Sequence, residues 1–146
     1  MALPTGSGTE TLHSHCFADV DANTTLIYGA QHHVYTVLSF TCYCNALNAA
    51  TDVGLLGLKH YDNHAGTSGA TIYIARFTIG VGETYVWNDK FSFNGYEPSG
   101  TAVMSAAVQI ANAAQAGSAD AELFFDMTHA SDDFDITVTY LDQDWS

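Results

Sequence analysis

Apolar and polar residues alternate over many short stretches of this chain, which is the periodicity of β-strands. The longest stretch, residues 34–44, consists of β-branched, aromatic and small side chains and contains no Gly, Pro or charge. This composition predicts a long strand near the middle of a sheet. Continuous alternation would divide its side chains between two faces, with Thr36, Leu38, Phe40, Cys42 and Cys44 on one and Tyr35, Val37, Ser39, Thr41 and Tyr43 on the other.

Shorter alternating stretches predict further strands, which are separated by turns rich in Gly and Asn. Gly54 and Gly57 lie inside one of these strands, where glycine indicates the close approach of another backbone. Many short strands at this spacing predict an all-β fold, a jelly-roll-like antiparallel β-sandwich. The expected strands are residues 24–28, 52–59, 71–79, 84–87, 90–93, 119–127 and 134–141.

Two segments depart from the strand pattern. Residues 102–116 are rich in Ala, lack Gly and Pro, and place polar residues at helical spacing, so they predict one short uncharged helix. Residues 1–23 have no sustained periodicity and predict an extended N-terminal arm, followed by the sandwich domain over residues 24–146. The residues expected to contact partners are Leu12, Cys16, Phe17 and Val20 in the arm and Val103, Met104 and Ile110 in the helix.

The charge balance excludes one class of partner. The chain has 146 residues, which suits a single domain, and its formal net charge is −13 because only Lys59, Arg76 and Lys90 are basic. An acidic surface repels phosphate, so the sequence argues against nucleic-acid binding. Charged residues make up only 13% of the chain. The exterior therefore consists largely of uncharged polar residues, which suits extensive protein contacts.

Neither a membrane segment nor a disulfide framework is expected. No apolar run approaches the roughly 18 residues of a membrane span. Residues 1–8 lack the basic start and apolar block of a secretory signal, so we expect a protein made in a cytoplasm. The three cysteines have no paired spacing, and Cys42 and Cys44 are interpreted as small buried apolar groups.

One set of residues has the form of a metal site. His60 and Asp62, followed much later by His129, match the two-histidine, one-carboxylate arrangement that binds iron on some jelly rolls. The third position is free in this pattern and the chain has seven histidines, so a polar loop explains the same residues. We therefore predict no catalytic residue, no metal and no cofactor, and keep this site as an alternative.

Other polar clusters in the chain are interpreted as ordinary polar packing, which is the more common role of such residues. Four aspartates near the C-terminus, Asp126, Asp132, Asp133 and Asp135, lack the loop pattern of a calcium motif and are interpreted as a solvated turn. The candidate histidine groups are His60 with His64, His13 with His15 and Cys16, and the adjacent His32 and His33, which must point to opposite faces of a strand.

Several stretches resemble the small β-sandwich proteins with which tailed bacteriophages decorate or brace the virion. Residues 24–58 follow the outline of that family: a strand, a turn, a long strand that ends at Asn, and a further strand. The resemblance covers most of residues 24–142, and the chain departs from it before residue 24 and in residues 96–117. The other matching stretches are residues 79–84 (Ile-Gly-Val-Gly-Glu-Thr), residues 87–90 (Trp-Asn-Asp-Lys) and residues 131–140 (Ser-Asp-Asp-Phe-Asp-Ile-Thr-Val-Thr-Tyr).

The resemblance implies a capsid decoration or cement protein without catalytic residues. Such a protein is a homotrimer on the capsid exterior, bound to the major capsid protein and assembled in the host cytoplasm. A neck, tail or head-fibre component of the same fold is a close alternative. From other classes, the alternatives are a small metal-dependent jelly-roll enzyme or ligand-binding module, and a carbohydrate-binding fold that uses Tyr61, Tyr73, Trp87 and Tyr96 as stacking faces.

Overall fold

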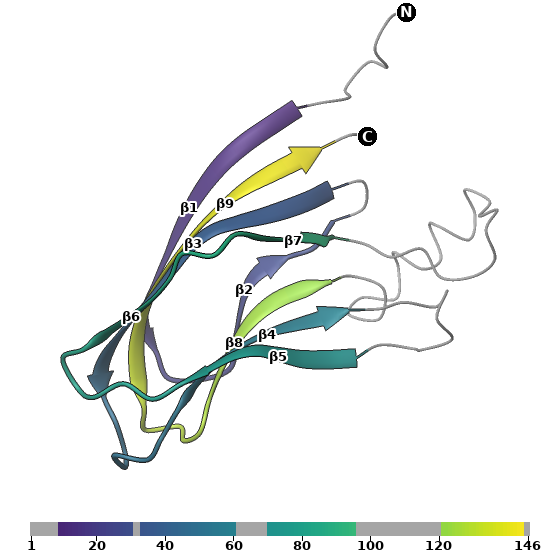
Figure 1. Ribbon diagram of the computed structural model, residues 1–146. Coiled ribbons are helices and arrows are strands. Elements are labelled where there is room, and N and C mark those ends of the chain that lie inside the picture. The colour runs from purple at the N-terminus through teal and green to yellow at the C-terminus, as the bar shows by residue number, and fades with distance from the viewer. Residues whose placement is uncertain (1–8, 31–32, 61–69, 96–120, 145–146) are drawn as a thin grey trace, which may run out of the picture.

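The computed structural model describes residues 9–30, 33–60, 70–95 and 121–144, and their regular structure is entirely β-strand (Figure 1). The predicted helix at residues 102–116 lies outside the described residues. None of the described residues belongs to a helix that could cross a membrane. The strands are β1 (Thr9–Val20), β2 (Thr24–Tyr28), β3 (His33–Ala46), β4 (Gly54–His60), β5 (Ala70–Phe77), β6 (Thr84–Trp87), β7 (Phe91–Asn94), β8 (Glu122–Met127) and β9 (Asp133–Asp144).

The strands form two antiparallel sheets that face each other as a β-sandwich (Figure 1). In the first sheet, the order is β1-β9-β3-β6, and β7 also pairs with β3. In the second sheet, the order is β2-β8-β4-β5. Among these strands, β4 and β5 follow each other within one sheet, as do β6 and β7, whereas every other step along the chain changes sheets. Non-local pairing therefore builds both layers.

The core between the sheets is aromatic and aliphatic, and the ring of Phe125 on β8 connects the two layers. Its centroid lies 5.3 Å from that of Phe134 on β9 and 6.4 Å from that of Phe40 on β3. All three side chains have no exposed surface, and each such burial is worth about 1.5–3 kcal/mol. The alternation predicted for β9 is confirmed, because its buried residues are Phe134, Ile136, Val138 and Tyr140.

The continuous alternation predicted for β3 is wrong, because the strand contains a β-bulge. The register with β9 shifts between Val37 and Ser39, which leaves Leu38 as an extra residue. One inserted residue turns every later side chain to the opposite face. Residues 88–90, which interrupt the neighbouring strand between β6 and β7, lie beside this bulge. The buried side chains of β3 are therefore Tyr35 and Val37 before the bulge and Phe40, Cys42 and Cys44 after it.

The prediction that residues 9–20 form an arm outside the sheet is also wrong. They form β1, which pairs with β9 from Thr9 to Val20 at the edge of the first sheet. Most of β1 is exposed, so its sequence shows little of the apolar alternation by which strands are recognised. The other predicted strands are confirmed with small differences at their ends, and residues 24–28 and 84–87 have the predicted bounds. The first two residues of the strand predicted at 119–127 lie outside the described residues.

Candidate functional site

The outer face of the first sheet carries a continuous group of uncharged side chains, which we call the uncharged face. The strand registers place these residues in rows across the sheet: Leu12, Leu141, Thr36 and Ser92 in one, Ser14, Thr139 and Ser39 in the next, and Cys16, Thr137, Thr41 and Val86 in the third. Between these rows, β3 and β9 turn buried core residues to the opposite side of the sheet: Val37 with Tyr140, and Phe40 with Val138. None of these side chains carries a formal charge.

Hydroxyl groups on the uncharged face bond to each other across strands. The Ser14 and Thr139 hydroxyls lie 3.0 Å apart, and those of Thr36 and Ser92 lie 2.8 Å apart. Apolar side chains stand between them, and Leu12 is 64% exposed. Burial of paired hydroxyls costs less than burial of unpaired ones, because each retains a hydrogen bond. This surface can therefore be covered by another protein at low cost.

The predicted interface residues of β1 divide between its two sides. Leu12 and Cys16 belong to the uncharged face and are exposed. Phe17 packs partly buried against the core, and Val20 is a core residue with 6% exposure. Val20 is therefore not available to a partner, because its side chain belongs to the hydrophobic core. Val103, Met104 and Ile110 lie outside the described residues.

Two histidines of the first sheet share one carboxylate, a cluster that no sequence motif predicted. Nδ1 of His33 lies 2.7 Å from Oδ1 of Asp142, and Nε2 of His13 lies 3.9 Å from the other oxygen of the same group. The ring of His13 also stacks on Tyr140 at 5.1 Å. The candidate set of His13, His15 and Cys16 is not brought together, since Cys16 lies on the other face of β1. Burial, then the charge of Asp142, raises the pKa of Tyr140.

The structure describes one member of the alternative metal site completely. His129 is exposed in the turn before β9, and its Nδ1 accepts a hydrogen bond of 3.1 Å from the backbone N–H of Ser131. His60 ends β4, and Asp62 lies outside the described residues. The contact of His129 belongs to the geometry of a turn and occupies Nδ1 of its ring.

The interpretation of the C-terminal aspartates as a solvated turn is wrong for Asp132, which has no exposed surface. Its carboxylate accepts hydrogen bonds from the backbone N–H groups of Asn48 at 2.9 Å and His129 at 3.1 Å. These bonds fasten the turn before β9 to the loop after β3, and they compensate for burial of the charge. Asp132 therefore has a structural role.

Three other carboxylates lie near each other at one corner of the first sheet. Oxygens of Asp19, Asp133 and Asp135 fall within 4.8 Å of one another. Asp135 accepts a hydrogen bond from the backbone N–H of Asp19 at 3.0 Å, and Asp133 accepts one from the Asn45 amide at 3.2 Å. These bonds account for their positions within the fold.

The prediction that Cys42 and Cys44 are buried apolar groups is confirmed. Neither has any exposed surface, and neither is in a disulfide. Burial, followed by the negative charges of Cys44 and Asp135, raises the pKa of Cys42 to about 12. Burial also raises the pKa of Cys44. These thiols remain protonated at neutral pH, so neither is an activated nucleophile.

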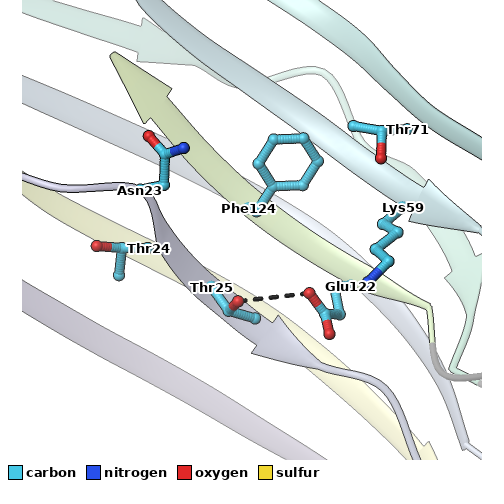
Figure 2. A pocket seen from close by; sticks show the side chains of 7 residues that line it. All are labelled: Asn23, Thr24, Thr25, Lys59, Thr71, Glu122 and Phe124. Carbon is cyan, nitrogen blue, oxygen red and sulfur yellow. Dashed lines mark hydrogen bonds between the residues drawn. The ribbon is translucent and has the colours of Figure 1, made fainter. Parts of the chain in front are cut away.

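The outer face of the second sheet contains a shallow groove of about 220 Å³. Figure 2 shows the ring of Phe124 at its centre, surrounded by polar side chains from all four strands and from the residue before β2. Thr25 donates a hydrogen bond of 3.4 Å to the Glu122 carboxylate at one side. The residues that line the groove are Asn23, Thr24, Thr25, Lys59, Thr71, Glu122 and Phe124.

The candidate stacking aromatics have different environments. Tyr73 is 49% exposed beside the groove, and its hydroxyl donates a hydrogen bond of 2.6 Å to Asp126, which is the main cause that raises its pKa. The indole N–H of Trp87 bonds to the carbonyl of Asp89, and its ring packs at a right angle on Phe91, so this residue is structural. Tyr61 and Tyr96 lie outside the described residues. Phe124, which the sequence did not single out, is the central ring.

No protein-family model and no curated protein matches this chain. Among solved structures, a Bacillus endospore appendage protein, described as belonging to a novel family of disulfide-linked pili, aligns with 100% of this chain and 96% of its own. The two share 9% sequence identity, with a TM-score of 0.43. This similarity carries no argument about function.

Proposed function

We propose that this protein is a non-enzymatic structural protein that functions within a larger protein assembly. The uncharged face of the first sheet is the observation that carries the proposal. The molecule has a formal net charge of −13, so most of its surface repels other acidic proteins and would lose solvated charge on contact. The uncharged face has neither disadvantage, and its alternating hydroxyl and apolar groups are typical of a surface that is covered in a complex.

The order of the strands in the two sheets favours a jelly roll. If β6 and β7 count as one interrupted strand, each sheet has four strands, and the order β1-β9-β3-β6 opposite β2-β8-β4-β5 is that of a double Greek key. This architecture is used by viral capsid proteins, lectins and cupins alike, so the fold does not identify the function.

The resemblance to phage proteins leads us to name the assembly. We infer a capsid decoration or cement protein that forms a homotrimer and braces the major capsid protein on the exterior of the virion. The acidity supports this role because it keeps the protein away from packaged DNA. A neck, tail or head-fibre position would use the same face.

Native mass spectrometry of the purified protein tests the assembly. We expect a closed, metal-free oligomer, in which Cys16 on the uncharged face is protected from alkylation. Thr41→Glu places a carboxylate in the third row of that face, between Thr137 and Val86. It should dissociate the oligomer, because an uncompensated charge in an interface costs about 3–5 kcal/mol. Thr78→Glu is the matched control, since Thr78 is exposed away from the uncharged face.

The proposal fails if the protein is a monomer that carries one iron or zinc ion per chain. It also fails if Thr41→Glu leaves the oligomer intact while circular dichroism shows both variants folded. If the purified protein is a monomer without metal, the assembly would have to form between this protein and a protein of another sequence. Capture on purified capsids would then distinguish binding to the capsid from binding to the neck, tail or head fibre.

A further inference from the structure

The groove on the outer face of the second sheet has an aromatic floor that a glycine makes possible. A Cβ atom at Gly57 would lie 2.4 Å from Cζ of Phe124, and 2.7 and 3.0 Å from the two Cε atoms. The outer half of the ring therefore rests on the backbone of β4, and only glycine leaves room for it. Gly54 and Gly57 were predicted to admit another backbone, whereas both are covered by aromatic rings, those of Phe77 and Phe124.

A second aromatic side chain holds this floor in place. The ring of Tyr73 meets that of Phe124 edge to face, with 5.8 Å between centroids and an interplanar angle of 62°. The hydroxyl of Tyr73 is itself held by Asp126. The Phe124 ring is thus supported by β4 beneath and by β5 at its edge, and it remains only partly buried. A supported, partly exposed aromatic face is a preorganised stacking surface.

The polar groups around the floor supply both donors and acceptors without net charge. Lys59 and Glu122 are cross-strand partners in the sheet, so one ammonium and one carboxylate stand side by side. The Asn23 amide, Thr24, and the Thr25 and Thr71 hydroxyls complete the lining. A pocket with an apolar wall and a few convergent polar groups is the usual form of a small-molecule site.

The electrostatics select a neutral ligand. Phosphates and other anions are repelled by a molecule of formal net charge −13. A cation would find a single carboxylate whose neighbour is Lys59. The volume of about 220 Å³ is below the roughly 300–1,000 Å³ of drug-sized pockets, which suits one ring-sized group.

We propose that this groove binds one neutral sugar residue of a glycan. The C–H face of a pyranose ring would lie on Phe124, and its hydroxyl groups would bond to Glu122, Lys59 and Asn23. A neutral polyhydroxylated ring combines the two properties that the groove requires, because one side is apolar and the rim both donates and accepts hydrogen bonds. The site lies on the sheet opposite the uncharged face, so an assembled protein would keep it available.

Saturation-transfer NMR with the full-length protein tests the proposal. The probes are glucose, galactose, mannose, N-acetylglucosamine and their trisaccharides at millimolar concentration. We expect transfer to at least one of them, and amide chemical-shift changes concentrated at Thr25, Lys59, Thr71 and Glu122. Absence of transfer to every probe, or shift changes centred on the first sheet, would overturn it.

Variants separate stacking from hydrogen bonding. Phe124→Ala should weaken binding about tenfold or more, because it removes the stacking face. Glu122→Gln keeps the size of the side chain and should weaken binding several-fold without altering the fold, so it remains informative if Phe124→Ala does not fold. Tyr43→Ala removes an exposed aromatic from the first sheet and should bind as the native protein does. Equal binding by all three variants would show that the sugar does not use the groove.

Discussion

The two outer faces of this sandwich share one core but differ in chemistry. The outer face of the first sheet carries the three rows of hydroxyl and apolar side chains, with Glu10 and Asp135 beyond them. The outer face of the second sheet carries Lys59 and Glu122 in an aromatic groove, and Arg76 and Asp126 outside its lining. Two of the three basic residues of the chain are therefore on the second face. On this difference rest our two proposals, that one sheet contacts other proteins and that the other binds a neutral sugar.

Removal of β1 should have the largest effect, because it eliminates part of the uncharged face while the outer face of the second sheet keeps all its strands. Deletion of residues 2–19 eliminates one edge of the uncharged face and the ladder between β1 and β9. Each lost hydrogen bond lowers the free energy of unfolding by roughly 0.5–1.5 kcal/mol, so the summed loss approaches the total free energy of unfolding of a typical domain. We expect loss of cooperative unfolding in urea. Deletion of residues 2–8 is the control, and an unchanged midpoint for the longer deletion would show that β1 adds nothing to the sandwich.

A change at Gly57 should disrupt the second face alone. Gly57→Ala introduces a Cβ that overlaps the ring of Phe124, and overpacking of this kind costs about 1–3 kcal/mol. Thermal unfolding should show the loss, and sugar binding should fall with it. Ser39→Ala on the uncharged face is the matched small change, for which we expect little effect. Equal stability of Gly57→Ala and the native protein would contradict the role of glycine beneath the ring.

The free energy that couples two paired hydroxyl groups on the uncharged face can be measured directly. A double-mutant cycle of Ser14→Ala and Thr139→Ala should give a coupling free energy of about 0.5–1.5 kcal/mol, because each hydroxyl satisfies the other. Unfolding in urea supplies the four free energies. A coupling of zero would mean that water satisfies these hydroxyls equally well, and the low cost of covering the face would lose its basis.

The smallest expected effect is a change in how stability depends on pH, and it concerns Tyr73 on the second face. The hydrogen bond to Asp126 raises the pKa of Tyr73 above its ordinary value near 10. The folded state therefore keeps the Tyr73 proton longer than the unfolded state does, so its contribution is complete below pH 10 and is lost as the pH rises further. Tyr73→Phe should show a shallower decrease of stability in that range, measured by urea unfolding. The same slope in both proteins would contradict the bond.

Alkylation by iodoacetamide provides an internal comparison for the thiols. Cys16 is exposed on β1, whereas Cys42 and Cys44 are buried with raised pKa values. In the dissociated protein, Cys16 should be modified first and the other two only on unfolding, as mass spectrometry of the peptides would show. Early modification of Cys42 would mean that the core is open at β3.

The sequence predicted most strands because their alternation is a local property. In residues 134–141, every second side chain is apolar, and burial between the sheets follows from that pattern. β1 was missed because an edge strand with little burial carries little of this signal. The groove was missed because Phe124 stands among other apolar residues of β8, and its outward direction depends on register with Thr25 and Gly57.

The sequence by itself determined the class of this protein: an acidic chain whose described residues form β-strands, with Cys42 and Cys44 buried between the sheets. Only the tertiary structure decided which side chains meet. Ser14 and Thr139 are separated by 125 positions, yet their hydroxyls bond. The bulge at Leu38 determines which side chains in the second half of β3 face outward. Periodicity is set by neighbours along the chain, whereas a functional surface is set by register between distant strands, which packing of the whole core selects.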